Sequence, residues 1–131
     1  MKKVILICTC CTVVLLMSFI NSNQPKPWAV PEKNAKMANP VKSDATSLAT
    51  GKTLYNQHCK SCHGAKGKGD GTKASQLDTE CGDFTKDLAG QTDGALFYKT
   101  SEGRKDMPSY KKKIPEADDI WAVINYMRTF K

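Results

Sequence analysis

The chain has 131 residues, of which 40% are hydrophobic and 25% charged, and its formal net charge at pH 7 is +7. This length fits one small domain with extensions. Lys2 and Lys3 belong to an apolar N-terminal segment, so the remaining chain carries +5. That mild excess comes without interleaved aromatic and basic residues, and we therefore expect no nucleic-acid partner.

The first 22 residues predict export from the cytoplasm. Lys2 and Lys3 precede an apolar run over residues 4–20 that contains no charge, which is the arrangement of a secretory signal. The run is also close to the shortest length that spans a membrane, and no small-residue cleavage site follows it. Residues 1–22 are therefore expected to be either a cleaved signal peptide or an N-terminal membrane anchor.

Residues 23–46 are expected to form a linker rich in proline and lysine. Pro25, Pro27, Pro31 and Pro40 interrupt this stretch, and proline removes hydrogen-bond donors and disfavours helix before it. The composition is typical of an extended, semi-rigid segment. Trp28 is unusual in such a linker, and we expect its ring to pack onto the surface of the domain that follows, residues 47–131.

Helices dominate the expected structure of residues 47–131. Asp44 to Ser47 are suitable N-caps for a first helix. A short helical turn is expected over residues 84–89, and a further helix from Thr92 as N-cap to Gly103 just past its end. The last helix is expected to begin near Pro115, with acidic residues in its first turn. Its apolar stripe consists of Ile120, Val123, Ile124 and Met127.

The first expected helix leads into Cys59-Lys60-Ser61-Cys62-His63, which has the form C-x-x-C-H. This pattern is the attachment signature of c-type haem. Residues three and four apart share one face of a helix, so two thiols and one imidazole can address one macrocycle from the same side. Cys59 and Cys62 would form thioether bonds to the haem, and His63 would be the proximal iron ligand. Covalent attachment of haem in bacteria takes place outside the cytoplasmic membrane, in agreement with the predicted export.

A bare C-x-x-C also allows two other interpretations. A zinc site needs about four ligands, which Cys59, Cys62, His63 and Cys81 could supply, with His58 as a further candidate. A redox dithiol is expected in a βαβ context, and no strong strand pattern lies near the motif. Haem is the favoured interpretation, which leaves Cys81 as a single thiol, either half-buried in a loop or available for an intermolecular disulfide.

Met107 is the candidate for the second axial ligand of the iron. It lies before Pro108 in an expected loop, far enough from His63 for the chain to pass around the haem. A thioether ligand favours ferrous iron and raises the reduction potential. Of the other methionines, Met127 lies on the apolar face of the last helix, where core packing is the better explanation.

These residues together resemble a class I c-type cytochrome, the small monohaem type, over residues 47–131. The resemblance depends on Gly51 and Tyr55 before the motif, Cys59-x-x-Cys62-His63-Gly64, Met107-Pro108, and a last helix with Trp121 and Tyr126. It implies an all-α fold, the small cytochrome c fold, with about three to five helices wrapped around one covalently bound haem. It also implies that the first and last helices cross with Gly51 near Tyr126.

The stretch Gly67-x-Gly69-Asp70-Gly71 resembles a common bacterial branch of this family. In that branch a proline usually follows Gly-Asp-Gly, and its carbonyl orients the proximal imidazole. Here Thr72 occupies that position, and Cys81-Gly82 replaces a second stretch that often contains proline. Any backbone carbonyl can still accept the hydrogen bond of the imidazole, and the residues alone leave the ring orientation of His63 open.

The resemblance predicts an electron carrier and not an enzyme, acting in a respiratory-type chain in the periplasm or at the outer face of the membrane. Its partners would be redox proteins, steered to the haem edge by two groups of lysines: Lys60, Lys66, Lys68 and Lys73, and Lys111, Lys112 and Lys113. A haem subunit of a larger membrane oxidoreductase is the first alternative. A peroxidase or gas sensor is the second, and it requires an open sixth position on the iron.

Overall fold

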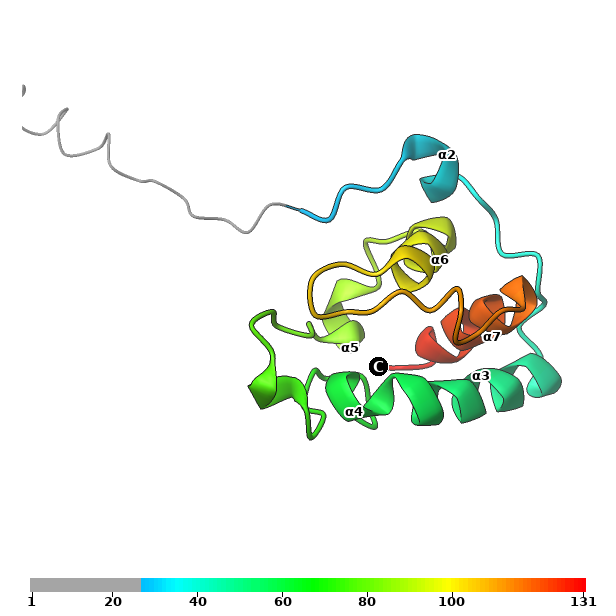
Figure 1. Ribbon diagram of the computed structural model, residues 1–131. Coiled ribbons are helices and arrows are strands. Elements are labelled where there is room, and N and C mark those ends of the chain that lie inside the picture. The colour runs from blue at the N-terminus through cyan, green and yellow to red at the C-terminus, as the bar shows by residue number, and fades with distance from the viewer. Residues whose placement is uncertain (1–26) are drawn as a thin grey trace, which may run out of the picture.

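The computed structural model describes residues 27–131, and the predicted export segment lies outside this range. The described part is helical, and its only β-type pairing is an isolated bridge between Arg104 and Met107. In chain order the elements are α2 (Glu32–Ala35), α3 (Ala45–His58), α4 (Lys60–His63), the 3-10 turn η2 (Ala74–Gln76), α5 (Phe84–Asp87), α6 (Asp93–Glu102) and α7 (Ala117–Met127). The expected all-α fold is therefore confirmed (Figure 1).

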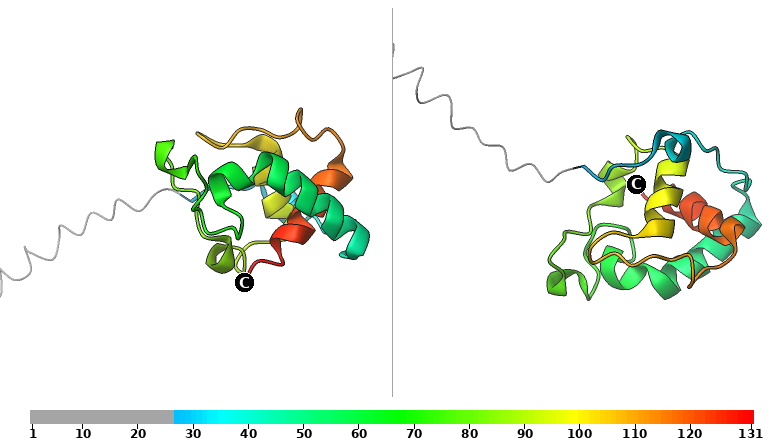
Figure 2. Two further views of the ribbon diagram at one scale, coloured as in Figure 1. Left: turned by 90° about the horizontal axis from the view of Figure 1, so that it is seen from below. Right: turned by 45° about the horizontal axis from the view of Figure 1, so that its top comes forward.

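The crossing of α3 and α7 is the tightest junction of the fold (Figures 1 and 2). A Cβ atom on Gly51 would lie 2.0 Å from the carbonyl oxygen of Ala122 and 2.9 Å from Cβ of Tyr126. Only glycine permits this approach, because any side chain would push the two backbones apart. The close contact of Gly51 with Tyr126 agrees with what the family resemblance implies.

The core lies where α7 meets α3 and α6. Tyr55 from α3 and Val123 and Ile124 from α7 are completely buried, and burial of such side chains stabilises the fold by about 1.5–3 kcal/mol each. On the other side of α7, the rings of Trp121 and Phe97 stack with their centroids 4.2 Å apart. The last helix thus contributes to both packing layers.

Local capping explains where α3 and α6 begin. Asp44 caps α3: its carboxylate accepts a hydrogen bond from the backbone N–H of Ser47, and the Ser47 hydroxyl accepts one from the N–H of Asp44. This reciprocal arrangement is a capping box. Thr92 caps α6 by accepting from the N–H of Ala95, and α6 ends before Gly103 as expected. The last helix begins at Ala117, two residues after Pro115.

Arg128 links the end of α7 to the residues between α5 and α6. Its guanidinium pairs with Asp93 at 2.7 Å and donates to the carbonyl oxygens of Leu88 (2.6 Å) and Gln91 (2.5 Å). Charged, multiply bonded contacts of this kind fix geometry more strongly than single neutral hydrogen bonds. This connection places α5 and α6 on the same side of the molecule as the end of α7.

Residues 27–44 lie along α6 and the start of α7, with α2 beside α6 (Figure 1). The short helix α2 was not expected in this proline-rich stretch. Among residues 27–131, no helix is long and apolar enough to cross a membrane. The predicted membrane segment, residues 4–20, falls outside the described range.

Candidate functional site

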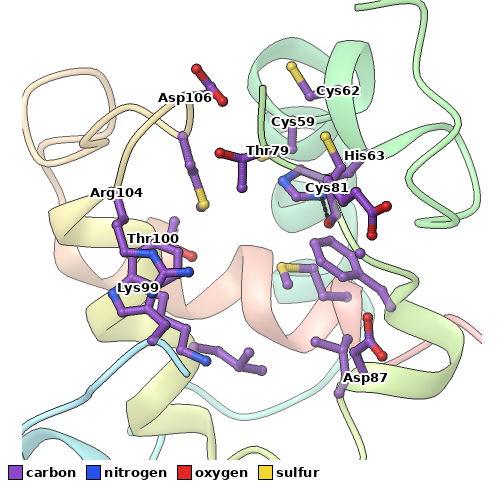
Figure 3. Close-up of a pocket in the computed structure, with 18 of the residues that line it drawn as sticks. Cys59, Cys62, His63, Thr79, Cys81, Asp87, Lys99, Thr100, Arg104 and Asp106 are labelled. Atoms are coloured by element: carbon purple, nitrogen blue, oxygen red, sulfur yellow. Dashed lines mark hydrogen bonds between the residues drawn. The ribbon is translucent and has the colours of Figure 1, made fainter. Parts of the chain in front are cut away.

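A cavity of about 220 Å³ opens between the end of α3, the loop over residues 77–82, helices α5 and α6, and the α6–α7 loop. Its walls are largely apolar, with Phe84, Leu88, Leu96 and Tyr110 among them. Cys59, Cys62, His63 and Met107 all line this cavity. The structure therefore brings every candidate haem-binding residue of the sequence to one place (Figure 3).

The C-x-x-C-H motif spans a break between α3 and α4. Cys59 departs from ideal helical geometry, with φ −114°, yet its carbonyl still accepts from the N–H groups of Cys62 (3.1 Å) and His63 (2.9 Å). The helical turn therefore continues through the break. This keeps the side chains of the motif on the cavity side, as the spacing predicts.

The two thiols of the motif differ in exposure. Cys59 is buried and Cys62 is partly exposed. Burial, reinforced by the neighbouring Cys62, raises the pKa of the Cys59 thiol to about 12. A thiol held neutral is a poor nucleophile at neutral pH, which counts against the redox-dithiol interpretation.

His63 is oriented by a backbone carbonyl. Its Nδ1 lies 3.1 Å from the carbonyl oxygen of Cys81, and its ring stacks on Phe84 at a centroid distance of 4.4 Å. Burial lowers the pKa of His63, although the Cys81 carbonyl opposes this effect. A neutral imidazole that donates from Nδ1 keeps its lone pair on Nε2, and this is the form that binds a metal.

The carbonyl that accepts from His63 belongs to Cys81 and not to Thr72, the position at which a proline is usual in the branch that this stretch resembles. Thr72 is exposed, and the loop around it is bonded to the backbone of α4: Gly71 N–H donates to Cys62 O, and Lys73 N–H to Ser61 O. That loop covers the back of the motif, so the acceptor for the imidazole comes from Cys81 further along the chain. The sequence signal was the unusual Cys81-Gly82 pair.

Met107 reaches the cavity from the α6–α7 loop, which is tied at several points. Arg104 and Met107 exchange two backbone hydrogen bonds, of 2.8 and 3.0 Å. The Ser109 hydroxyl donates to Ser101 O, and the Tyr110 hydroxyl donates to His58 O at 2.8 Å. The last contact joins the methionine loop directly to the helix that carries the motif.

Met127 also lines the cavity, but from a different setting. It lies on α7 with only 6% of its surface exposed, within the buried apolar cluster. Its side chain is part of the packing between α7 and its neighbours. Met107 lies on a loop, is partly buried, and packs only at the edge of this cluster.

The side chains of Lys99 and Arg104 lie on the cavity wall opposite Cys59 and Cys62. Figure 3 shows Arg104 and Lys99 on one side and Cys59, Cys62 and His63 on the other. Within residues 27–131, neither cation has an ion-pair partner, and the buried Nε of Arg104 has no hydrogen-bond partner. Burial, and then the nearby Arg104, lower the pKa of Lys99. Such an arrangement is suited to an anionic group within the cavity.

The donor set of the cavity fits haem c. A haem carries its vinyl groups at one edge and its two carboxylates at the opposite edge, and the thiols and the cations of this cavity are separated in the same sense. The neutral imidazole of His63 and the thioether of Met107 are suited to bind iron, and the apolar walls are suited to the macrocycle. Lys99 and Arg104 were missed in the sequence analysis. Lys99 lies near the end of a helix and Arg104 in the loop that follows, and nothing in the local pattern marks either as part of a site.

The zinc interpretation receives no support from the geometry. In the part of the chain that the structure describes, no three side chains of His, Cys, Asp or Glu are arranged to hold a metal ion between them. His58 faces the ring of Tyr110, with centroids 6.0 Å apart, and is absent from the cavity walls. The thiol of Cys81 lines the cavity, and its pKa is raised by burial and by the neighbouring Cys62 and Asp106.

Comparison with known proteins gives three findings. The family model described as "Cytochrome C oxidase, cbb3-type, subunit III" matches residues 46–127. A chain of the reducing HAO-like protein complex of Kuenenia stuttgartiensis has a similar structure, with a TM-score of 0.63 and 25% sequence identity. The likeness covers 70% of this chain and 46% of that chain, so it extends over about half of that protein's length. None of the curated proteins matches the chain.

Proposed function

The chain belongs to the family of c-type cytochrome domains that includes subunit III of cbb3-type cytochrome oxidases, and from this premise we propose that it is a monohaem electron carrier. The observation that carries the proposal is the meeting of Cys59, Cys62, His63 and Met107 in one cavity. We further propose that it acts outside the cytoplasmic membrane, in a respiratory-type chain, and performs no catalysis of its own.

In this proposal each of the four residues has one role. The thiols of Cys59 and Cys62 would hold haem c covalently, and His63 and Met107 would bind its iron. When bound, the haem supplies an iron that cycles between the ferrous and ferric states. His63 is held in the metal-binding tautomer by the Cys81 carbonyl. Met107 supplies a soft donor that favours the ferrous state.

The rest of the cavity keeps the redox centre in a low-dielectric environment. Phe84, Leu88, Leu96 and Tyr110 line the cavity and would limit the access of water to a bound haem. The Tyr110 hydroxyl is bonded to His58 O. If His63 and Met107 both bind the iron, no position on it is left for a substrate. This is the feature that separates an electron carrier from a peroxidase or gas sensor.

The proposed partners are redox proteins with acidic docking surfaces. Lys60, Lys66, Lys68 and Lys73 are exposed around the motif, and Lys111, Lys112 and Lys113 are exposed after the methionine loop. Positive charge near the haem edge steers acidic partners and makes association dependent on salt. The K66Q/K68Q variant is expected to weaken this salt dependence, whereas K33Q/K52Q, which changes two exposed lysines away from the cavity walls, serves as the control.

A second candidate function is that of a haem subunit within a larger membrane oxidoreductase. The matching family is described as an oxidase subunit, and the structural neighbour comes from a protein complex. The predicted apolar segment, residues 4–20, suits a membrane tether. Extraction with detergent and co-purification of further subunits distinguishes this candidate from a free shuttle.

The experiment for the proposed function is a redox titration of the purified full chain, with its mass measured in parallel. The mass is expected to include one covalently bound haem, and the titration to follow one reversible one-electron step. Carbon monoxide is expected not to bind the reduced protein at neutral pH. Binding of carbon monoxide to the unmodified protein would favour the peroxidase or sensor, and a mass without haem would overturn the proposal.

A further inference from the structure

Residues 27–44, here named the N-terminal arm, lie outside the region that matches the family and yet are bonded to the domain at several points. The Thr92 hydroxyl donates to Ala35 O at 2.7 Å. The amide of Asn39 donates to Asn125 Oδ1 at 2.9 Å, and the amide of Asn125 donates to Val41 O at 3.0 Å. Asn125 is buried on α7, so the arm satisfies a polar group of the core.

The surface of α6 is shaped to accept the arm. A Cβ atom on Gly94 would lie 2.1 Å from the carbonyl oxygen of Asn34 and 2.7 Å from that of Met37. The arm and the helix therefore approach at backbone distance, which requires glycine at this position. Such contact places the start of the arm, with Trp28, beside the end of α6.

Trp28 covers the cationic wall of the haem cavity. Its ring lies 4.7 Å from Cζ of Arg104 and 5.7 Å from Nζ of Lys99, measured to the ring centroid, and it lines the cavity itself. A guanidinium over an aromatic face is attracted by about 0.5–2 kcal/mol, with the larger value where water is excluded. Lys99 is additionally bonded to Gln91, whereas Arg104 has its buried Nε without a hydrogen-bond partner among residues 27–131.

We propose that the N-terminal arm completes the redox centre, with Trp28 as the positioning residue that holds Arg104 toward the carboxylates of the haem. The inference rests on the proposed function, because it presumes haem in the cavity. Arg104 is also bonded through its backbone to Met107, so the charge and the proposed sulfur ligand share one rigid turn. A cation held near the iron in a site that excludes water stabilises the ferrous state.

The reduction potential of Trp28 variants of the full chain tests this role. W28L keeps apolar bulk but removes the aromatic face, so Arg104 turns toward solvent and the equilibrium constant for reduction falls by roughly threefold. W28F keeps an aromatic face and is expected to restore most of the wild-type value. The matched control is M37A, which removes an exposed apolar side chain of the same arm without touching the cavity walls.

A double-mutant cycle with R104Q decides whether Trp28 acts through Arg104. The proposal predicts that W28L changes the potential in the wild type but has almost no further effect in R104Q, because the charge that Trp28 positions is gone. Equal shifts by W28L in both backgrounds would overturn it, as would a W28L potential equal to that of M37A. The spectrum of covalently bound haem distinguishes failure of the proposed function from failure of this inference. If the wild type shows no such spectrum, the proposed function is wrong. If the haem is intact but Trp28 variants leave the potential unchanged, only this inference is wrong.

Discussion

The two halves of the molecule are stabilised in different ways. Where α3 crosses α7, the backbones touch at Gly51 and completely buried side chains fill the junction. On the other side, the loops over residues 77–82 and 103–110 stand around a cavity with largely apolar walls. The crossing is built from the side chains of the protein alone, whereas the loops of the other half surround the space that the proposed haem would occupy. We therefore expect haem binding and folding to be coupled mainly through these loops.

The largest effect is expected when haem attachment is abolished. In the C59A/C62A variant, the cavity walls lose the apolar body that they share, and a domain this small has little other core. We expect a largely unfolded protein, with any residual helicity confined to the α3–α7 crossing. Circular dichroism measures this, and native-like helicity in the variant would contradict the expected dependence on haem.

The crossing itself is tested by placing a side chain at its closest point. G51V puts a Cβ atom 2.0 Å from the Ala122 carbonyl, and the resulting overpacking is expected to lower the free energy of unfolding by about 3 kcal/mol. K52V introduces the same side chain at the exposed neighbouring position of the same helix and is the control. Similar denaturation midpoints for the two variants would show that the helices do not meet at Gly51.

Arg128 joins the end of α7 to the residues between α5 and α6, and its loss is expected to be intermediate in effect. R128A leaves the carbonyls of Leu88 and Gln91 and the carboxylate of Asp93 without their shared partner, at a cost of about 1–3 kcal/mol. K36A, which removes an exposed ion pair with Glu32, is expected to cost less than about 0.5 kcal/mol. Thermal unfolding of the haem-loaded R128A and K36A variants measures the two losses of stability. Equal losses would show that the contacts of Arg128 contribute no more than an exposed ion pair.

The smallest effect on stability is expected from the loss of the N-cap residue of α5, Asp83. Hydrogen bonds from Thr85, and then from Lys86, lower the pKa of Asp83 to about 2. Because this pKa lies below the unfolded value of about 3.9, the carboxylate contributes stability above about pH 4 that is lost as the pH falls toward about 2. D83N removes this contribution. The stability difference between wild type and D83N should therefore shrink through that window, and a constant difference would contradict the assignment.

Features set by neighbouring residues in the chain could be predicted from the sequence, and features set by distant contacts could not. The capping residues Asp44 and Thr92 fix helix starts over three or four residues, and the thiols and imidazole of the motif lie within one helical turn. The acceptor for His63 comes from Cys81, in a separate loop, and the sequence left open which backbone carbonyl this would be.

The cationic wall of the cavity depends on contacts over a still longer range. Trp28 was expected to pack on the domain, but nothing in the local pattern indicates that its ring meets Arg104 and Lys99. Such pairs arise only when the arm, α6 and the methionine loop come together. The roles of Cys59, Cys62, His63 and Met107 remain predictions from the sequence that the cavity makes testable.

The most direct test of the central claim, one iron between His63 and Met107, is the near-infrared sulfur-to-iron band of the ferric protein. Two methionines line the cavity, and a leucine at either position conserves apolar volume at small cost. The account predicts that wild type and M127L show the band, that M107L lacks it, and that reduced M107L binds carbon monoxide. A band that persists in M107L, or is absent from the wild type, would contradict the account.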